Sequence, residues 1–185
     1  MINRYFSEIK EICDGLDVAE IQKTIDILAE LKKNGRLFIL GVGGSAANAS
    51  HAVNDFRKIC GIETYAPTDN VAELTARTND NGWDSIFVDW LKVSKLKKED
   101  VILILSVGGG NAEKRVSVNL INALDFAKEV GCKILGIVSR DGGRTKQVAD
   151  ACILIPVVNA EYITPHAEAF QAILWHLIVN HSNLK

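Results

Sequence analysis

Two stretches of helical spacing open the chain. Apolar residues recur every three or four positions in residues 2–12 and again in 18–31, which is the period of an amphipathic helix. Two lysines followed by Gly35 close the second stretch, and cations and glycine are typical of a helix end. The pattern predicts an N-terminal helical hairpin over residues 1–35.

From residue 36 onward, short apolar runs alternate with helical patterns. The runs are uniformly apolar, which is typical of parallel strands covered by helices on both faces. Strands are expected at 37–40, 62–66, 101–105, 133–138 and 152–156, and helices at 45–59, 70–94, 112–129, 144–149 and 165–181. This order predicts an α/β fold, a doubly wound parallel sheet of about five strands, in one domain with its α/β core at 36–185.

The composition of the 185 residues, 48% hydrophobic and 24% charged, is that of a globular domain and excludes a disordered chain. A net charge of −2 gives no cationic field that could hold nucleic acid or an anionic membrane. No apolar run approaches the ~20 residues that cross a bilayer. We therefore expect a cytoplasmic protein with no nucleic-acid or membrane partner, whose four cysteines are reduced because they lack C-x-x-C spacing.

Glycine-rich loops follow three of the predicted strands, at 41–45, 106–111 and 139–143. The carboxyl ends of parallel strands meet at one edge of a sheet, and ligands bind there. Glycines let the backbone approach an anion, and the helix that follows offers free N–H groups. The loops predict a phosphorylated or otherwise anionic ligand, with these substrate-binding candidates: Gly43, Gly44, Ser45, Ser106, Gly108, Gly109, Asn111 and Lys114.

The first loop also fits a dinucleotide fingerprint. Gly41, Gly43 and Ala46 give G-x-G-x-x-A, and Glu63 follows at about the distance of a ribose-binding acid. A small nicotinamide-dependent oxidoreductase is therefore one alternative. His51 and Asp55, one turn apart on the helix after this loop, have no use in nicotinamide binding, so we expect no nucleotide cofactor.

A second polar pair lies in the last predicted helix, where Glu168 and His176 interrupt an apolar run. If the two helices meet, His51, Asp55, Glu168 and His176 supply two imidazoles and two carboxylates. Such a set suits Zn²⁺ or another borderline divalent metal, and it also suits proton transfer next to a sugar carbonyl. The residues alone leave both roles open. His166 is a third histidine candidate, and His181 is expected at the surface.

Five stretches of the chain match one known pattern: GVGGSAANASHAVNDF, LTARTNDNGW, the loop from Ser106, SRDGG, and the last helix with Glu168 and His176. On these stretches, nearly the whole chain resembles the sugar isomerase (SIS) domain and, within it, the phosphoheptose isomerase family. The resemblance implies a five-stranded parallel sheet and a homotetramer with active sites at subunit interfaces. It also implies conversion of sedoheptulose 7-phosphate to a mannoheptose 7-phosphate through an enediol.

The resemblance also implies roles for single residues. Asp55 stands at the position of the family's catalytic glutamate, as the base, and His176 at that of the histidine opposite it. His51 and Glu168 stand at zinc-ligand positions, with Asp55 and His176 completing the set. The implied phosphate-binding or other substrate-binding positions are Ser45, Ser106, Asp69, Asn79 and Asp80.

Four departures from the family pattern concern the site. Asp55 replaces glutamate, Glu168 replaces glutamine, and Val42 replaces the usual asparagine of the first loop. The second loop reads SVGGGN where the family has STSGNS, so hydroxyl donors are missing, and Asn111, Lys114 or Arg115 are candidates to replace them. Two further alternatives stay open on the sequence: isomerisation of another sugar phosphate, and a non-catalytic phosphosugar-binding regulator of the same fold.

Overall fold

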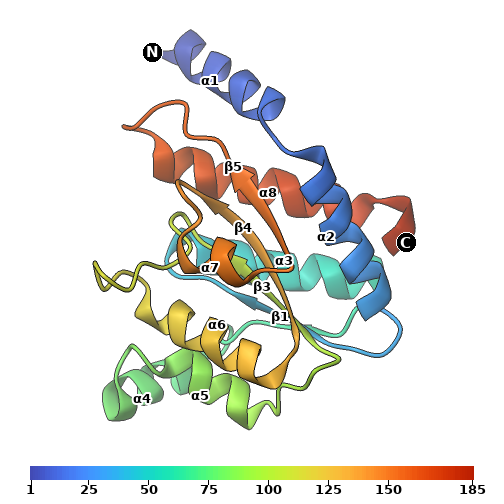
Figure 1. The fold of residues 1–185 in the computed structure, drawn as a ribbon, viewed down its shortest axis with the longest axis vertical. Helices are drawn as coiled ribbons and strands as arrows, with labels where there is room; N and C mark the ends of the chain where they lie inside the picture. The colour runs from blue at the N-terminus through green and yellow to red at the C-terminus, as the bar shows by residue number, and fades with distance from the viewer.

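The computed structural model describes all 185 residues and contains a five-stranded parallel sheet with helices on both faces (Figure 1). The strand order is β2-β1-β3-β4-β5. The strands are β1 (Leu37–Leu40), β2 (Thr64–Tyr65), β3 (Val101–Leu105), β4 (Lys133–Ser139) and β5 (Ala151–Ile155). The predicted fold class is confirmed, and all five expected strands are present.

Eight α-helices surround the sheet. They are α1 (Ile2–Asp14), α2 (Val18–Leu31), α3 (Gly44–Cys60), α4 (Val71–Asn81), α5 (Ile86–Val93), α6 (Val118–Val130), α7 (Gly143–Val148) and α8 (Ile163–Asn180). Local sequence fixes several ends: the Asp17 carboxylate accepts hydrogen bonds from the first N–H groups of α2, and Gly61 and Gly131 end α3 and α6 in the left-handed conformation. No helix is both long enough and apolar enough to cross a bilayer.

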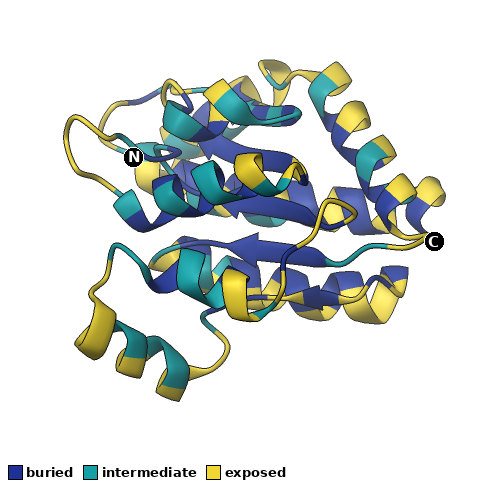
Figure 2. Ribbon diagram, turned by 60° about the horizontal axis from the view of Figure 1, so that its bottom comes forward, coloured by how far each residue is buried: buried dark blue, intermediate teal, exposed yellow.

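Successive residues of each central strand enter two separate cores. In β1, Leu37 and Ile39 pack with α2, α3 and α8, whereas Phe38 and Leu40 pack with α5 and α6. Each fully buried side chain of this kind stabilises the fold by about 1.5–3 kcal/mol. Figure 2 shows the strands as a buried layer between the helices. The uniformly apolar strand sequences follow from this burial on both faces.

The chain reverses its winding direction between β1 and β3. After β1 it enters α3 on one face, and after β3 it enters α6 on the other, because these helices belong to different cores. Such a reversal opens a crevice between the carboxyl ends of the two neighbouring strands. The loops at 41–43 and 106–117 border this crevice.

The predicted helix at 112–129 begins too early. Residues 111–117 form a turn closed by an antiparallel bridge between Asn111 and Val116, and α6 starts only at Val118. Arg115 and Ser117 have φ angles of +50° and +54°. Residues with positive φ do not fit a right-handed helix, so α6 can begin only after Ser117.

The two helices predicted at the N-terminus are both present, as α1 and α2. The two helices do not pack side by side: α1 extends beyond the end of the sheet, and α2 continues from it along β5 (Figure 1). The partners of α1 lie elsewhere. The buried Glu8 carboxylate contacts His166 Nε2 at 2.9 Å and accepts a hydrogen bond from Asn159 Nδ2 at 2.7 Å. These contacts hold α1 against the start of α8, so His166 has a structural role.

Candidate active site

Helices α3 and α8 pack side by side and run in the same direction. Gln171 Nε2 donates to Ser45 Oγ at 3.0 Å near the start of α3, and Cys60 Sγ at its end donates to the Val179 carbonyl at 3.5 Å. Asn48 Nδ2 bridges the pair, donating to Gln171 Oε1 at 2.8 Å. Residues at matching heights on the two helices therefore face one another.

Asp55 lies between two imidazoles at this helix pair. Its Oδ2 atom is 3.4 Å from His176 Nε2 and 3.6 Å from His51 Nε2. His51 and Asp55 are one turn apart on α3, and His176 comes from α8. One ligand atom from each residue can be chosen so that all lie within 4.8 Å of one another. The structure thus brings together three of the four residues that the sequence pointed to.

The carboxylate is held more tightly than the imidazoles. Trp175 Nε1 donates to Asp55 Oδ2 at 3.2 Å, and Asn54 Nδ2 donates to Oδ1 at 3.0 Å. The Asp55 side chain is 10% exposed, whereas His51 and His176 are 56% and 47% exposed. The site therefore opens outward between the imidazoles, with a fixed carboxylate at its base.

The orientation of His176 follows from its other ring nitrogen. Nδ1 lies 2.8 Å from the carbonyl oxygen of Ala172. A carbonyl oxygen only accepts hydrogen bonds, so Nδ1 carries a proton and donates it. In the neutral ring, Nε2 then carries the lone pair and faces Asp55. A histidine held in this way is suited to bind a metal or to accept a proton.

The donor set at this cluster fits a zinc ion. Two imidazole nitrogens and one carboxylate oxygen are the ligands of many catalytic zinc sites, which keep a further position for water or substrate. The spacing of His51, Asp55 and His176 is compatible with a shared ion, and the exposed imidazoles leave one side open.

Glu168 does not join this cluster. Its carboxylate lies against Gly44 in the first turn of α3, so closely that a Cβ atom at Gly44 would be 2.4 Å from Oε2. Glu168 lies eight residues before His176, or about 12 Å along α8. The expectation that it binds a metal together with the other three is therefore wrong within one chain. At the N-terminus of α3 its negative charge is favourably placed against the helix dipole.

A cavity of about 200 Å³ lies in the crevice between β1 and β3. Residues from the first two glycine loops and from three further segments line it. The polar side chains that line it are Ser45, Ser106, Ser117, Arg140 and Thr164.

The two buried serines of this cavity have unused donors. Ser45 and Ser106 are only 2% and 7% exposed. Each hydroxyl oxygen accepts a hydrogen bond, from Gln171 and from the Gly109 amide respectively, and neither donates to a protein acceptor. A buried donor without a partner is costly, so these two hydroxyls favour an acceptor inside the cavity, such as a phosphate oxygen.

A second cavity of about 280 Å³ adjoins the first and shares Gly108, Val116, Ser117 and Arg140 with it. Asn111 and Lys114 line this second cavity and not the first. Arg115 turns away and forms an ion pair with Asp84 at 2.8 Å. Of the substitutes considered for the missing hydroxyls, Asn111 and Lys114 thus lie near the crevice, and Arg115 does not.

The glycines of these loops have separate roles. Gly43 precedes α3 with φ +64°, and Gly109 has φ +68°. A Cβ atom at Gly109 would be 2.0 Å from the Gly142 carbonyl oxygen. Gly109 therefore allows the second and third loops to pack against each other, and its carbonyl accepts a hydrogen bond from the Thr145 hydroxyl at 2.9 Å.

The remaining predicted residues lie apart from both cavities. Asp69 is exposed and accepts a hydrogen bond from the Ser50 hydroxyl. Asn79 and Asp80 are exposed at the end of α4 and are bonded to each other at 2.8 Å. Within one chain these three residues make no hydrogen bond to Ser45 or Ser106, and none to the histidines of the cluster.

Ser45 and Asp55 are separated by ten residues, or about 15 Å along α3. The direct path between them is filled by Asn48 and the fully buried Gln171. The strand-end cavity contains no residue of the imidazole–carboxylate cluster. One chain therefore presents the two halves of the candidate site on separate surfaces.

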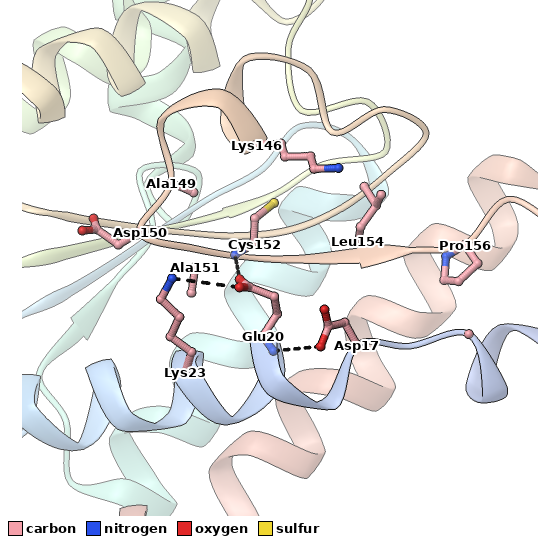
Figure 3. A pocket seen from close by; sticks show the side chains of 11 residues that line it. Asp17, Glu20, Lys23, Lys146, Ala149, Asp150, Ala151, Cys152, Leu154 and Pro156 are labelled. Atoms are coloured by element: carbon pink, nitrogen blue, oxygen red, sulfur yellow. Dashed lines mark hydrogen bonds and ion pairs between the residues drawn. The ribbon is translucent and has the colours of Figure 1, made fainter.

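The largest cavity, about 560 Å³, lies elsewhere, between α2 and the edge strand β5 (Figure 3). Its Glu20 is already paired: the carboxylate accepts a hydrogen bond from the Cys152 amide at 2.8 Å and lies 3.9 Å from Lys23. Burial raises the pKa of the Cys152 thiol to about 11, so it is not a nucleophile at neutral pH. Volume alone does not identify the functional site here.

Sequence reasoning missed several residues of the candidate site. Ser117 and Thr164 lie outside the glycine loops, and Arg140 lies in the SRDGG stretch without a pattern of its own that predicts a role. Trp175 lay in an apolar run, and its indole N–H contact with Asp55 depends on the packing of α8 against α3. An isolated amphipathic residue in a buried helix gives no signal of its partner.

Comparison with known proteins agrees with this geometry. Residues 4–139 match the family model of the SIS domain. A phosphoheptose isomerase of Syntrophotalea carbinolica is 31% identical over 95% of this chain and 89% of its own length, and one of Aliarcobacter butzleri is 31% identical over 85% and 81%. The solved structure of a phosphoheptose isomerase from Neisseria gonorrhoeae superposes with a TM-score of 0.81 at 24% identity, covering 97% of this chain and 95% of that one. The chain therefore belongs to the SIS domain family, among the relatives of the phosphoheptose isomerases.

Proposed function

We propose that the protein is a phosphoheptose isomerase, which converts sedoheptulose 7-phosphate to D-glycero-D-manno-heptose 7-phosphate. The observation that carries the proposal is the 3.4 Å approach of Asp55 Oδ2 and His176 Nε2. Aldose–ketose isomerisation needs one group to move a proton between carbons and another to move a proton between oxygens. The names of the relatives in Syntrophotalea and Aliarcobacter support the choice of sugar.

The strand-end cavity holds the phosphate in this proposal. The Ser45 and Ser106 hydroxyls donate to phosphate oxygens, and the glycine-rich backbone from Ser106 to Asn111 adds N–H donors. Lys114 supplies a positive charge in the adjoining second cavity. Binding energy at the phosphate fixes the position of C1 and C2 for the chemical step.

Asp55 and His176 then move the protons. Asp55 takes a proton from C1 of the ketose, and the electron pair of that bond forms the C1–C2 double bond of an enediolate with its charge on O2. His176 Nε2 accepts the proton of the O1 hydroxyl and passes it to O2. Asp55 returns its proton to C2, and O1 becomes the aldehyde oxygen. Both side chains end in their starting states.

A zinc ion would be held by His51, Asp55 and His176, with Glu168 of the same chain too far away to contribute. Such an ion supplies a positive charge that polarises the carbonyl and stabilises the enediolate. Two of these residues are also the ones assigned to proton transfer. The metal-free and the metal-loaded protein are therefore to be assayed side by side.

The complete site needs a second copy of the chain. The imidazole–carboxylate cluster opens outward, and the contact of Asn48 with the buried Gln171 separates it from the cavity of its own chain. In a homotetramer, the cluster of one subunit faces the cavity of a neighbour. The cytoplasm stays the predicted compartment.

Incubation of the protein with sedoheptulose 7-phosphate, followed by NMR of the sugar, tests the proposal. The aldose signals should appear with the wild type, and Asp55→Asn and His176→Gln should each lower turnover by about 10²–10⁴-fold. His181→Gln serves as a control, because it removes a histidine that directly follows α8 and lies outside the cluster. No aldose from the wild type, or wild-type turnover in both variants, would overturn the proposal.

A further inference from the structure

Arg140 occupies an unusual place among the arginines of the chain. Each of the other six arginines donates a hydrogen bond to a carboxylate or a carbonyl. The guanidinium of Arg140 makes no hydrogen bond and no ion pair, although it lines both cavities at the strand ends. An arginine that is free of protein partners and borders a cavity has all its donors available to a ligand.

The backbone holds Arg140 at the edge of the crevice. It follows directly after β4, whose last residue Ser139 donates to the Val107 carbonyl at 3.1 Å through its amide and to the Ile155 carbonyl at 2.8 Å through its hydroxyl. Arg140 itself has φ +56°. A left-handed conformation is strained for a residue with a Cβ atom, and such residues are concentrated at functional sites.

The Arg140 side chain also borders the space left by the missing hydroxyls of the second loop. A Cβ atom at Gly108 would have a single neighbour within 4 Å, the Cδ atom of Arg140 at 3.8 Å. The third position of SVGGGN therefore has room for a side chain, and the nearest group to that room is the arginine stem.

We propose that Arg140 binds the phosphate of the sugar substrate and replaces the hydroxyl donors that the 106–111 loop lacks. Its forked guanidinium matches two phosphate oxygens, and a charge-assisted hydrogen bond is about twice as strong as a neutral one. Lys114 lines the second cavity and not the first, and Arg115 is paired with Asp84. Arg140 is thus the cation that lines the first cavity, together with Ser45 and Ser106. The inference rests on the proposed function for the identity of the sugar, and on the cavity alone for the anion.

Arg140→Gln tests the role, with Arg115→Gln as the matched control from the neighbouring loop. Loss of a charged contact should weaken binding of inorganic phosphate, followed as thermal stabilisation of the protein, by about tenfold to a hundredfold. The KM for sedoheptulose 7-phosphate should rise by a similar factor, with kcat changed much less. Arg115→Gln should leave both values within about twofold of the wild type.

Two additional variants make the test independent of folding and strain. Arg140→Gly removes the guanidinium and the strained conformation together, and should show the same loss of phosphate binding with no loss of thermal stability. Gly108→Ser combined with Arg140→Gln should regain part of the affinity, since the new hydroxyl has room at that position.

The outcomes separate the two proposals. Phosphate affinity and KM that stay unchanged in Arg140→Gln and Arg140→Gly, in an active enzyme, would overturn the role of Arg140. A different result is that the wild type does not convert the heptose phosphate, while both variants bind inorganic phosphate more weakly than the wild type does. That result would overturn the proposed function and support the anion site.

Discussion

A mixture of two inactive variants should be active if each site combines two subunits. The double variant Ser45→Ala, Ser106→Ala removes the hydroxyls of the cavity, and Asp55→Asn removes the base. About 15 Å of helix and the buried Gln171 separate these groups within one chain. A subunit that lacks its cavity hydroxyls still carries an intact base, which can serve the intact cavity of the other variant.

The size of the recovered activity follows from random assembly. In an equal mixture, half of the cavities and half of the bases are intact, so roughly one quarter of the interfacial sites receive both. Asp55→Asn alone should retain about 10⁻² to 10⁻⁴ of wild-type turnover. The mixture should therefore exceed that parent by at least about 25-fold.

Co-expression with two different affinity tags and purification on both would isolate the mixed oligomers. Turnover of sedoheptulose 7-phosphate by these oligomers is then compared with that of the two parents. Activity no higher than the mean of the parents, in oligomers that contain both chains, would show that each site is built from a single chain.

Three other perturbations have defined outcomes. Asp100→Ala should lower the free energy of unfolding in urea by about 3–5 kcal/mol. The fully buried Asp100 carboxylate accepts a hydrogen bond from Arg36 at 2.7 Å, and the substitution leaves the Arg36 guanidinium without this carboxylate. A decrease below about 1 kcal/mol would contradict this expectation. The hydrogen bond from His166 is the largest cause that lowers the pKa of Glu8 from 4.5, so this group contributes stability above that pH and loses it as the pH falls further. Glu8→Gln should therefore flatten the acid side of a plot of melting temperature against pH, and an unchanged slope would exclude the coupling. Elemental analysis, with activity measured after chelation and zinc readdition, should reveal a metal that His51→Ala loses; full activity in metal-free protein would leave the cluster with proton transfer alone.

The order of elements could be read from the sequence because both faces of the sheet are buried. Uniform apolar runs such as 101–105 have few other interpretations in a chain of this length. The start of α6 could not be read, since 112–117 lacks the proline or glycine that marks a turn and its positive φ angles at Arg115 and Ser117 depend on tertiary contacts. The packing partners of α1 could not be read for a related reason, because Glu8 contacts residues near the other end of the chain.

The candidate site was predictable in its residue types and less so in its connections. Helical spacing put His51 next to Asp55, and the packing of α3 against α8 added His176. Spacing alone also grouped Glu168 with these residues. Because a helix rises about 1.5 Å per residue, the eight residues between Glu168 and His176 keep Glu168 away from the cluster. Arg140 could not be assigned, because nothing in the sequence reports which arginines lack a protein partner.

The parallel pairing of α3 and α8 means that both helices start at the ligand-binding edge of the sheet. Their first turns line the strand-end cavity with Ser45 and Thr164, and their later turns carry the carboxylate and the imidazoles. A slide of α8 by one turn would remove Gln171 from Ser45 and His176 from Asp55 in the same movement. Substrate affinity and turnover therefore both depend on the contact between α3 and α8. Substitutions that loosen this contact should lower both, even when the substituted residue does not contact the substrate.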